Sequence, residues 1–201
     1  MADDKTFRMA LAVGLLIFMP IAVYRRVRSQ ATGETLDRRQ EGLPILLTLR
    51  PIGIAMMLAV LAFVINPAWM AWSSVPLPAW IRWTGIGIGA IGGVLLTWTL
   101  SHLGENLTDT VVTRRKHTMI TTGPYAWVRH PFYVSAALAI AANALATANW
   151  FIFVTGFLAF SLMVIRCRTE EEKLVERFDE EYRAYTRRTG RFVPRFSARR
   201  Q

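Results

Sequence analysis

The side chains best suited to chemistry lie in residues 123–133, between a basic polar loop and a long apolar segment. Pro131 lacks a backbone N–H and biases His130 away from helical geometry, so a helix is predicted to begin at about Pro131. Arg129 and His130 then lie beside backbone donors at the positive end of the helix dipole. Two interpretations stay open: a site for an anionic group of a ligand, or a juxtamembrane anchor of basic and aromatic side chains.

The sequence of this stretch, GPYAWVRHPFY, resembles the GxYxxxRHPxYxG signature of the isoprenylcysteine carboxyl methyltransferase family and the related phospholipid N-methyltransferases. A second block with the same resemblance comprises residues 170–174 and 178–185 and closes at 191–194. Together the two blocks extend the resemblance over about residues 101–194. Two positions depart from the family pattern, because Ser135 and Asp179 replace glycines. Ser135 would affect close packing in a helix, and Asp179 only a turn.

The resemblance implies a membrane methyltransferase that uses S-adenosylmethionine and takes a lipophilic, isoprenoid-like substrate, with a carboxylate as the expected methyl acceptor. By family position, the residues lining the cofactor would be His117, Thr118, Met119, Ile120, Tyr125, His130, Pro131, Phe132, Tyr133 and Glu170. Arg166 would be the catalytic and substrate-binding residue. Its charge would orient a carboxylate and keep it ionised, or hold a phosphate if the acceptor is an amine.

The implied reaction needs no acid–base triad, because the sulfonium methyl group of the cofactor is already activated. The enzyme has to align the acceptor and exclude water. No metal is expected, since His102, His117 and His130 lack the spacing of zinc ligands and Cys167 is the single cysteine.

Three alternatives remain beside the carboxyl methyltransferase. Phospholipid or other lipid amine N-methylation would use the same fold and cofactor. An NADPH-dependent oxidoreductase of the sterol-reductase type would have a similar C-terminal membrane architecture. A non-enzymatic membrane scaffold would explain the apolar segments but not the dense polar motifs.

The elements that must position these residues are predicted from the apolar runs. The chain has 201 residues, 53% of them apolar. Charge is absent from residues 9–24, 51–72, 83–103, 132–148 and 150–165. Because a transmembrane helix takes ~20 apolar residues, we expect an all-α, polytopic membrane protein with about five transmembrane helices. Residues 1–103 would hold three of them with a cytoplasmic loop, and residues 104–201 would be the family core.

The formal net charge of +10 is interpreted as a topology signal and not as a nucleic-acid surface. Basic residues cluster after the first, third and fifth runs, whereas the loops after the second and fourth hold only Arg82. The positive-inside rule then puts the N-terminus outside and the C-terminus in the cytoplasm. We expect a bacterial cytoplasmic membrane rather than the endoplasmic reticulum.

Small residues predict where the helices pack closely. Gly85, Gly89 and Gly93 are spaced to form one bare stripe on the third span. The fourth and fifth spans should form a hairpin with a tight turn at Ala148 and Asn149.

The C-terminal region, from Thr169 to about residue 189, is predicted to be a separate amphipathic helix on the cytoplasmic side. Thr169 is its expected N-cap, and the acidic residues after it suit a first turn. Two of these three glutamates, residues 171 and 172, are expected to face solvent. On a continuous helix Arg166 and Glu170 would share a face.

Overall fold

The computed structural model describes residues 2–30, 43–103 and 119–195. Within these ranges the chain is helical and forms no strand; isolated bridges join Ser74 to Asn149 and Val128 to Gly190. The helices are α1 (Ala2–Gln30), α2 (Leu43–Ile65), η2 (Pro67–Ser73), α3 (Ala79–Leu103), η4 (Gly123–Ala126), α4 (Pro131–Thr147) and α5 (Trp150–Arg188). The all-α prediction is confirmed.

The helices have the length and composition of membrane spans. Asp4–Arg28, Leu47–Ile65, Ala79–Leu103 and a window within α5 are long and apolar enough to cross a bilayer. The fifth, α4, is apolar but has 17 residues, at the lower limit for a span. Large apolar side chains point outward, for example Leu16 at 74% and Val94 at 65% exposure. Such a surface suits lipid, and the chain is an integral membrane protein.

The second helix begins before the uncharged run 51–72. Pro51 lies inside α2 and does not mark its start. Neighbouring helices can re-satisfy the backbone groups that a proline frees, so a proline is tolerated in a membrane helix.

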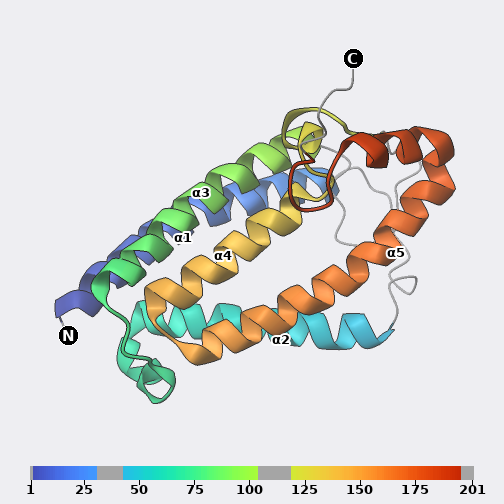
Figure 1. The fold of residues 1–201 in the computed structure, drawn as a ribbon. Helices are drawn as coiled ribbons and strands as arrows, with labels where there is room; N and C mark the ends of the chain where they lie inside the picture. Colours follow the sequence, from blue (N-terminus) through green and yellow to red (C-terminus); the bar gives the residue numbers. More distant parts are fainter. Residues whose placement is uncertain (1, 31–42, 104–118, 196–201) are drawn as a thin grey trace.

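The ends of the helices gather at two opposite ends of the bundle (Figure 1). At one end, Nε of Arg8 donates to the Val64 carbonyl at 2.9 Å, and Val75 N donates to the Ala148 carbonyl at 2.8 Å. The predicted tight turn is confirmed here: Ala148 has φ 50° and Asn149 caps α5 by accepting from Ile152 N. The other end holds the end of α3, η4, the start of α4 and the C-terminal part of α5.

The third and fourth helices pack closely over glycines. A Cβ on Gly85 would lie 2.8 Å from Ala146 N, one on Gly89 3.2 Å from Ala142 Cβ, and one on Gly92 3.0 Å from Leu138 Cβ. The prediction for Gly85 and Gly89 is confirmed. It is wrong for Gly93, which faces Phe18 of α1. At 3.6 residues per turn, position 92 lies about 20° from position 85 around the helix, whereas position 93 lies about 80° away.

Arg82 was assigned to a loop by its position, but the structure buries it in the first turns of α3 at 8% exposure. Its Nη1 donates to Asp4 Oδ1 at 2.8 Å and its Nε to the Ala146 carbonyl at 3.0 Å. Its guanidinium lies 4.0 Å from the centroid of the Phe7 ring. A buried charge needs such partners, and these contacts join α1, α3 and α4.

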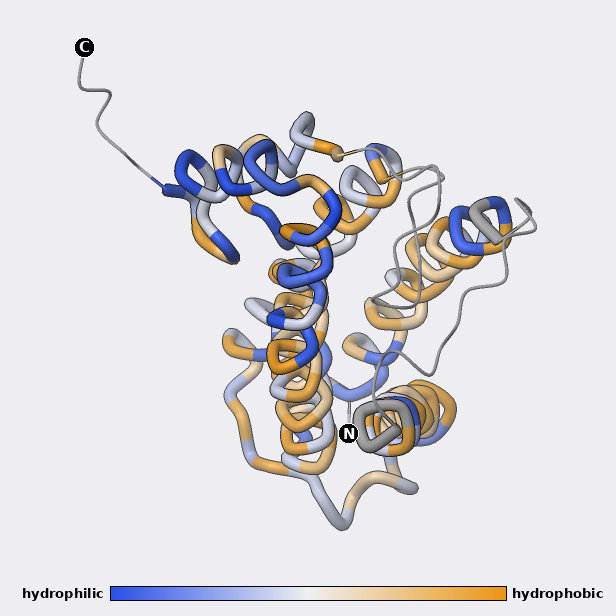
Figure 2. The backbone as a smooth tube through the Cα atoms, turned by 90° about the vertical axis from the view of Figure 1, so that its right-hand side faces the viewer, coloured by the Kyte–Doolittle hydropathy of each residue, from blue (hydrophilic) through white to orange (hydrophobic). Residues whose placement is uncertain are grey.

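The last helix corrects the prediction of a separate amphipathic helix. Helix α5 continues from Trp150 through Thr169 to Arg188, so Thr169 is not an N-cap and the three glutamates do not form a first turn. The interruption lies at Asp179, whose φ of 38° and ψ of −115° are non-helical. Beyond it the helix turns back toward η4 (Figure 1), and Figure 2 shows hydrophilic residues gathered on this part. The amphipathic pattern itself is confirmed, since Tyr182 and Tyr185 are buried.

Candidate functional site

The first motif, residues 123–133, forms the loop that leads into α4. The helix begins at Pro131 with His130 as its N-cap residue, as predicted. Arg129 N donates to the Gly190 carbonyl at 2.8 Å, and His130 N donates to the Arg191 carbonyl at 3.1 Å. The segment after α5 is therefore fixed against the loop before α4.

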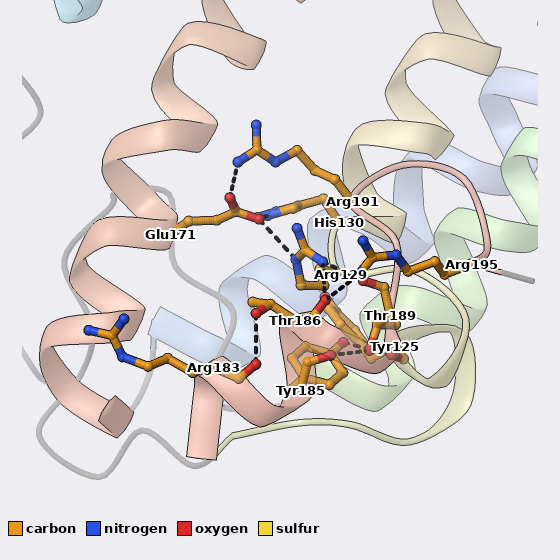
Figure 3. Close-up of polar contacts among 10 residues, drawn as sticks. All are labelled: Tyr125, Arg129, His130, Glu171, Arg183, Tyr185, Thr186, Thr189, Arg191 and Arg195. Carbon is orange, nitrogen blue, oxygen red and sulfur yellow. Dashed lines mark hydrogen bonds and ion pairs between the residues drawn. The ribbon is translucent and has the colours of Figure 1, made fainter. Parts of the chain in front are cut away.

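Glu171 is the centre of a buried ionic cluster with Arg129, His130 and Arg191 (Figure 3). Its Oε1 lies 3.0 Å from Nε of Arg129 and 3.2 Å from Nε2 of His130, and its Oε2 accepts from Arg191. Glu171 is 9% exposed. We expected an anion of a ligand, or headgroups, at Arg129 and His130. The anion is instead the protein's own carboxylate, and both side chains point inward.

The electrostatics of this cluster favour an ionised carboxylate. Burial alone would raise the pKa of Glu171, but hydrogen bonds from His130, Arg191 and Arg129 lower that pKa from 4.5 to about 2. Charge-assisted hydrogen bonds of this kind stabilise the charged form. The expectation that Glu171 faces solvent is wrong, because α5 continues through this turn and directs it toward α4; Glu172 is exposed, as expected.

Glu170 lies beside Tyr133, and the two come from different motif blocks. The Tyr133 hydroxyl donates to Oε2 of Glu170 at 2.8 Å, across 37 residues of sequence. Tyr133 is buried at 6% exposure and Glu170 partly buried. Because α5 is continuous, Arg166 lies one turn before Glu170 on the same face.

Two further tyrosines bring the end of α5 against η4. The Tyr185 hydroxyl donates to the Tyr125 carbonyl at 2.6 Å. Burial, and then the charge of Glu170, raise the pKa of Tyr125 well above its usual value. The Tyr182 hydroxyl is buried and has no hydrogen-bond partner among the described residues. In the sequence, Tyr182 is one position within the predicted amphipathic helix, and no local signal marks it as part of a site.

The other predicted site residues differ in how far they are buried and in whether the structure describes them. Pro131 is buried, whereas Phe132 is 38% exposed and lies outside the cluster. Met119 and Ile120 are partly buried at the start of a described range. His117 and Thr118 lie outside the described residues.

The first motif needs glycine at its first position for a steric reason. Gly123 has φ 61°, and a Cβ on it would lie 2.4 Å from the His102 ring. His102 lies in the last turn of α3, and its Nδ1 lies 3.0 Å from the Trp98 carbonyl. Glycine therefore lets the motif loop pass close to α3.

Among the described residues, His130, Cys167 and Glu171 bring ligand-type atoms within 4.8 Å of one another. Sequence spacing did not suggest this set, because its members come from two helices. The two oxygens of Glu171 already accept from guanidinium groups, so a cation would compete with two arginines. The donor set is that of an ion-pair cluster.

Comparisons with known proteins place this site in context. The pattern of the isoprenylcysteine carboxyl methyltransferase family matches residues 85–176, from α3 into α5. A cobalt-zinc-cadmium resistance protein, CzcN, of Cupriavidus metallidurans is 39% identical over 42% of this chain and 39% of its own length. A nickel-cobalt-cadmium resistance protein, NccN, of Alcaligenes xylosoxydans xylosoxydans is 34% identical over 51% of this chain and 49% of its own.

A third relative is the protein-S-isoprenylcysteine O-methyltransferase of Saccharomyces cerevisiae, 28% identical over 52% of this chain and 45% of its own length. The chain spans less than half the length of each of these curated relatives. A solved structure of the eukaryotic intramembrane Ras methyltransferase ICMT covers 92% of this chain and 72% of that chain. With a TM-score of 0.58 and 19% identity, it shows the same fold.

Proposed function

We propose that this chain is a member of the isoprenylcysteine carboxyl methyltransferase family, whose pattern matches residues 85–176, and an integral membrane enzyme that methylates a lipophilic substrate with S-adenosylmethionine. The observation that carries the proposal is the contact between Tyr133 and Glu170, at 2.8 Å. It joins the two motif blocks at the end of the bundle where the apolar part of α5 has ended. A polar cofactor and an apolar substrate can both reach such a position.

The charges of the site fit S-adenosylmethionine. The cofactor has a sulfonium and an ammonium group, and Glu170 is a partly buried carboxylate that suits a cation. The carboxylate of the cofactor, on the same carbon atom as the ammonium group, suits the neighbouring part of the site, where Arg129 and Arg191 bring two positive charges to the one negative charge of Glu171. Adenosine needs apolar faces and backbone polar groups, which Tyr125 and its loop supply. When bound, the cofactor supplies an already activated methyl group.

The residues that would hold the cofactor are His130, Tyr133 and Glu170 at the cluster, and Tyr125 in η4. His117, Thr118, Met119, Ile120, Pro131 and Phe132 keep their family-implied roles as proposals. Their common task is to bind and orient the cofactor and to exclude water.

Arg166 is proposed to orient the substrate. It follows the apolar run 150–165 directly, and it precedes Glu170 by one turn. A guanidinium binds a carboxylate through two parallel hydrogen bonds and keeps it ionised. An ionised carboxylate needs no base before it accepts a methyl group, so a carboxylate is the acceptor that this arrangement suits best.

The site is proposed to face the cytoplasm, with the N-terminus outside. The same end of the bundle holds Arg25, Arg26 and Arg28 at the end of α1, which agrees with the positive-inside rule. The bacterial relatives support a bacterial cytoplasmic membrane. Residues 104–201 would act as the family core, with residues 1–103 providing its transmembrane support.

Methyl transfer from labelled S-adenosylmethionine tests the proposal. The purified protein is offered N-acetyl-S-farnesylcysteine as a carboxylate acceptor and phosphatidylethanolamine as an amine acceptor. The proposal predicts a base-labile label on the first acceptor, since methyl esters are hydrolysed by base and N-methyl groups are not. Arg166→Lys should lose most of this transfer, while Arg168→Lys should keep it. Base-stable label on the lipid amine alone would overturn the carboxylate assignment.

A further inference from the structure

Tyr182 has a buried hydroxyl that the described protein does not satisfy. The residue is 2% exposed, and its oxygen has no hydrogen-bond partner among residues 2–30, 43–103 and 119–195. Two other tyrosines of the site differ in this respect. Tyr185 donates to the Tyr125 carbonyl at 2.6 Å, and Tyr133 donates to Glu170 at 2.8 Å. Leaving a buried hydroxyl without a partner is destabilising, so such a group calls for a functional explanation.

The surroundings of Tyr182 indicate which kind of group would satisfy it. Its phenol lies within electrostatic range of Glu171, Arg129 and Glu170, so it belongs to the same site. Three guanidinium groups, those of Arg129, Arg166 and Arg191, lie at this site against the two carboxylates of Glu170 and Glu171. A hydroxyl donor beside a surplus of positive charge suits an anionic oxygen.

We infer that the Tyr182 hydroxyl donates a hydrogen bond to the amino-acid carboxylate of bound S-adenosylmethionine. This inference rests on the proposed function and adds to it a specific contact for one end of the cofactor. Glu170 is negatively charged, so it suits the ammonium group, which is on the same carbon atom of the cofactor as the carboxylate. Tyr182 would thus help to set which way round the cofactor lies.

The test compares two ligands on the full-length protein in detergent: S-adenosylmethionine, and decarboxylated S-adenosylmethionine, which lacks only the carboxylate. Tyr182→Phe removes the hydroxyl and keeps the ring. We expect it to weaken S-adenosylmethionine binding about tenfold, as for a hydrogen bond to a charged group. The dissociation constant of the decarboxylated ligand should stay within about twofold. Without ligand, the thermal midpoint should be unchanged or higher, because an unsatisfied buried group is removed.

Tyr185→Phe is the matched control for stability. It removes a hydroxyl that has a protein partner, so its ligand-free thermal midpoint should fall. Equal weakening of both ligands by Tyr182→Phe, or weakening of neither, would overturn the carboxylate contact, as would a fall in the ligand-free midpoint. Wild-type protein that binds no S-adenosylmethionine would contradict the proposed function itself, so the two failures are distinguishable.

Discussion

Nε2 of His130 lies 3.2 Å from Oε1 of Glu171, across 41 residues of sequence. This contact joins the residue before α4 to the middle of α5. Arg129 and Arg191 bind the same carboxylate, so one buried side chain connects the loop before α4, helix α5 and the segment that follows it (Figure 3). The proposed cofactor residues Tyr133 and Glu170 are the immediate neighbours of this cluster, which fixes their positions.

The first prediction concerns the charge of Glu171. Glu171→Gln keeps the size of the side chain but leaves Arg129, whose side chain is 12% exposed, without its counter-charge. Removing one partner of a buried ion pair costs about 3 kcal/mol, which should lower Tm by roughly 6–12 °C. Thermal denaturation in detergent measures this. Glu172→Gln, at an exposed position, should stay close to wild type, and equal losses in both variants would count against the cluster.

A second prediction follows from the lowered pKa of Glu171, about 2 against 4.5. Because the folded-state pKa lies below the unfolded one, the stabilisation is complete above about pH 4.5 and is lost as the pH falls toward 2. Wild-type Tm should therefore fall with acid through this window more steeply than the Tm of Glu171→Gln. Parallel curves for the two proteins would mean that Glu171 is not the group responsible.

Asp179 provides a third prediction, because its φ of 38° is one that glycine adopts without penalty. Such a conformation costs other residues about 1–3 kcal/mol. Asp179→Gly should therefore raise Tm by a few degrees. Its exposed contact with Arg183, at 3.4 Å, contributes little in water. Asp179→Ala removes the carboxylate but keeps the Cβ, so it should bring no gain; the strain argument fails if alanine and glycine behave alike.

Two glycines of α3 allow a matched test of helix packing. A Cβ on Gly85 would lie 2.8 Å from the backbone nitrogen of Ala146, whereas one on Gly87 would meet nothing within 4 Å. Gly85→Ala should destabilise the protein by about 1–3 kcal/mol. Gly87→Ala should be neutral or slightly stabilising, since alanine favours helix. Similar midpoints for the two variants would contradict the close approach of α3 and α4.

Local sequence rules predicted those features that depend on near neighbours. The start of α4 at Pro131 and the turn at Ala148 follow from backbone preferences, and the apolar runs follow from composition. Glu171 could not be recognised in the same way, because three consecutive glutamates look alike until the path of α5 is known. The pairing of Arg82 with Asp4, across 78 residues, likewise depends on how α1 packs.

The two departures from the family pattern, Ser135 and Asp179, have different effects on the structure. Ser135, which replaces a glycine, is 2% exposed and bonds back to the Pro131 carbonyl at 3.0 Å, beside Gly92 of the neighbouring helix. The close packing of α3 and α4 is thus maintained by a glycine on α3 in place of one on α4. Asp179 was expected to affect only a turn, and the structure shows that it sits at the turn where α5 changes direction.

Equilibrium binding of labelled S-adenosylmethionine in detergent tests the central claim most directly, with NADPH as competitor and two variants of neighbouring glutamates. Glu170→Gln should weaken binding about tenfold or more, because it removes the partly buried carboxylate that Tyr133 contacts. Glu172→Gln, at an exposed position, should stay within about twofold of wild type. NADPH should not displace the label. Displacement by NADPH, or a Glu170→Gln protein that binds within twofold of wild type, would contradict the account.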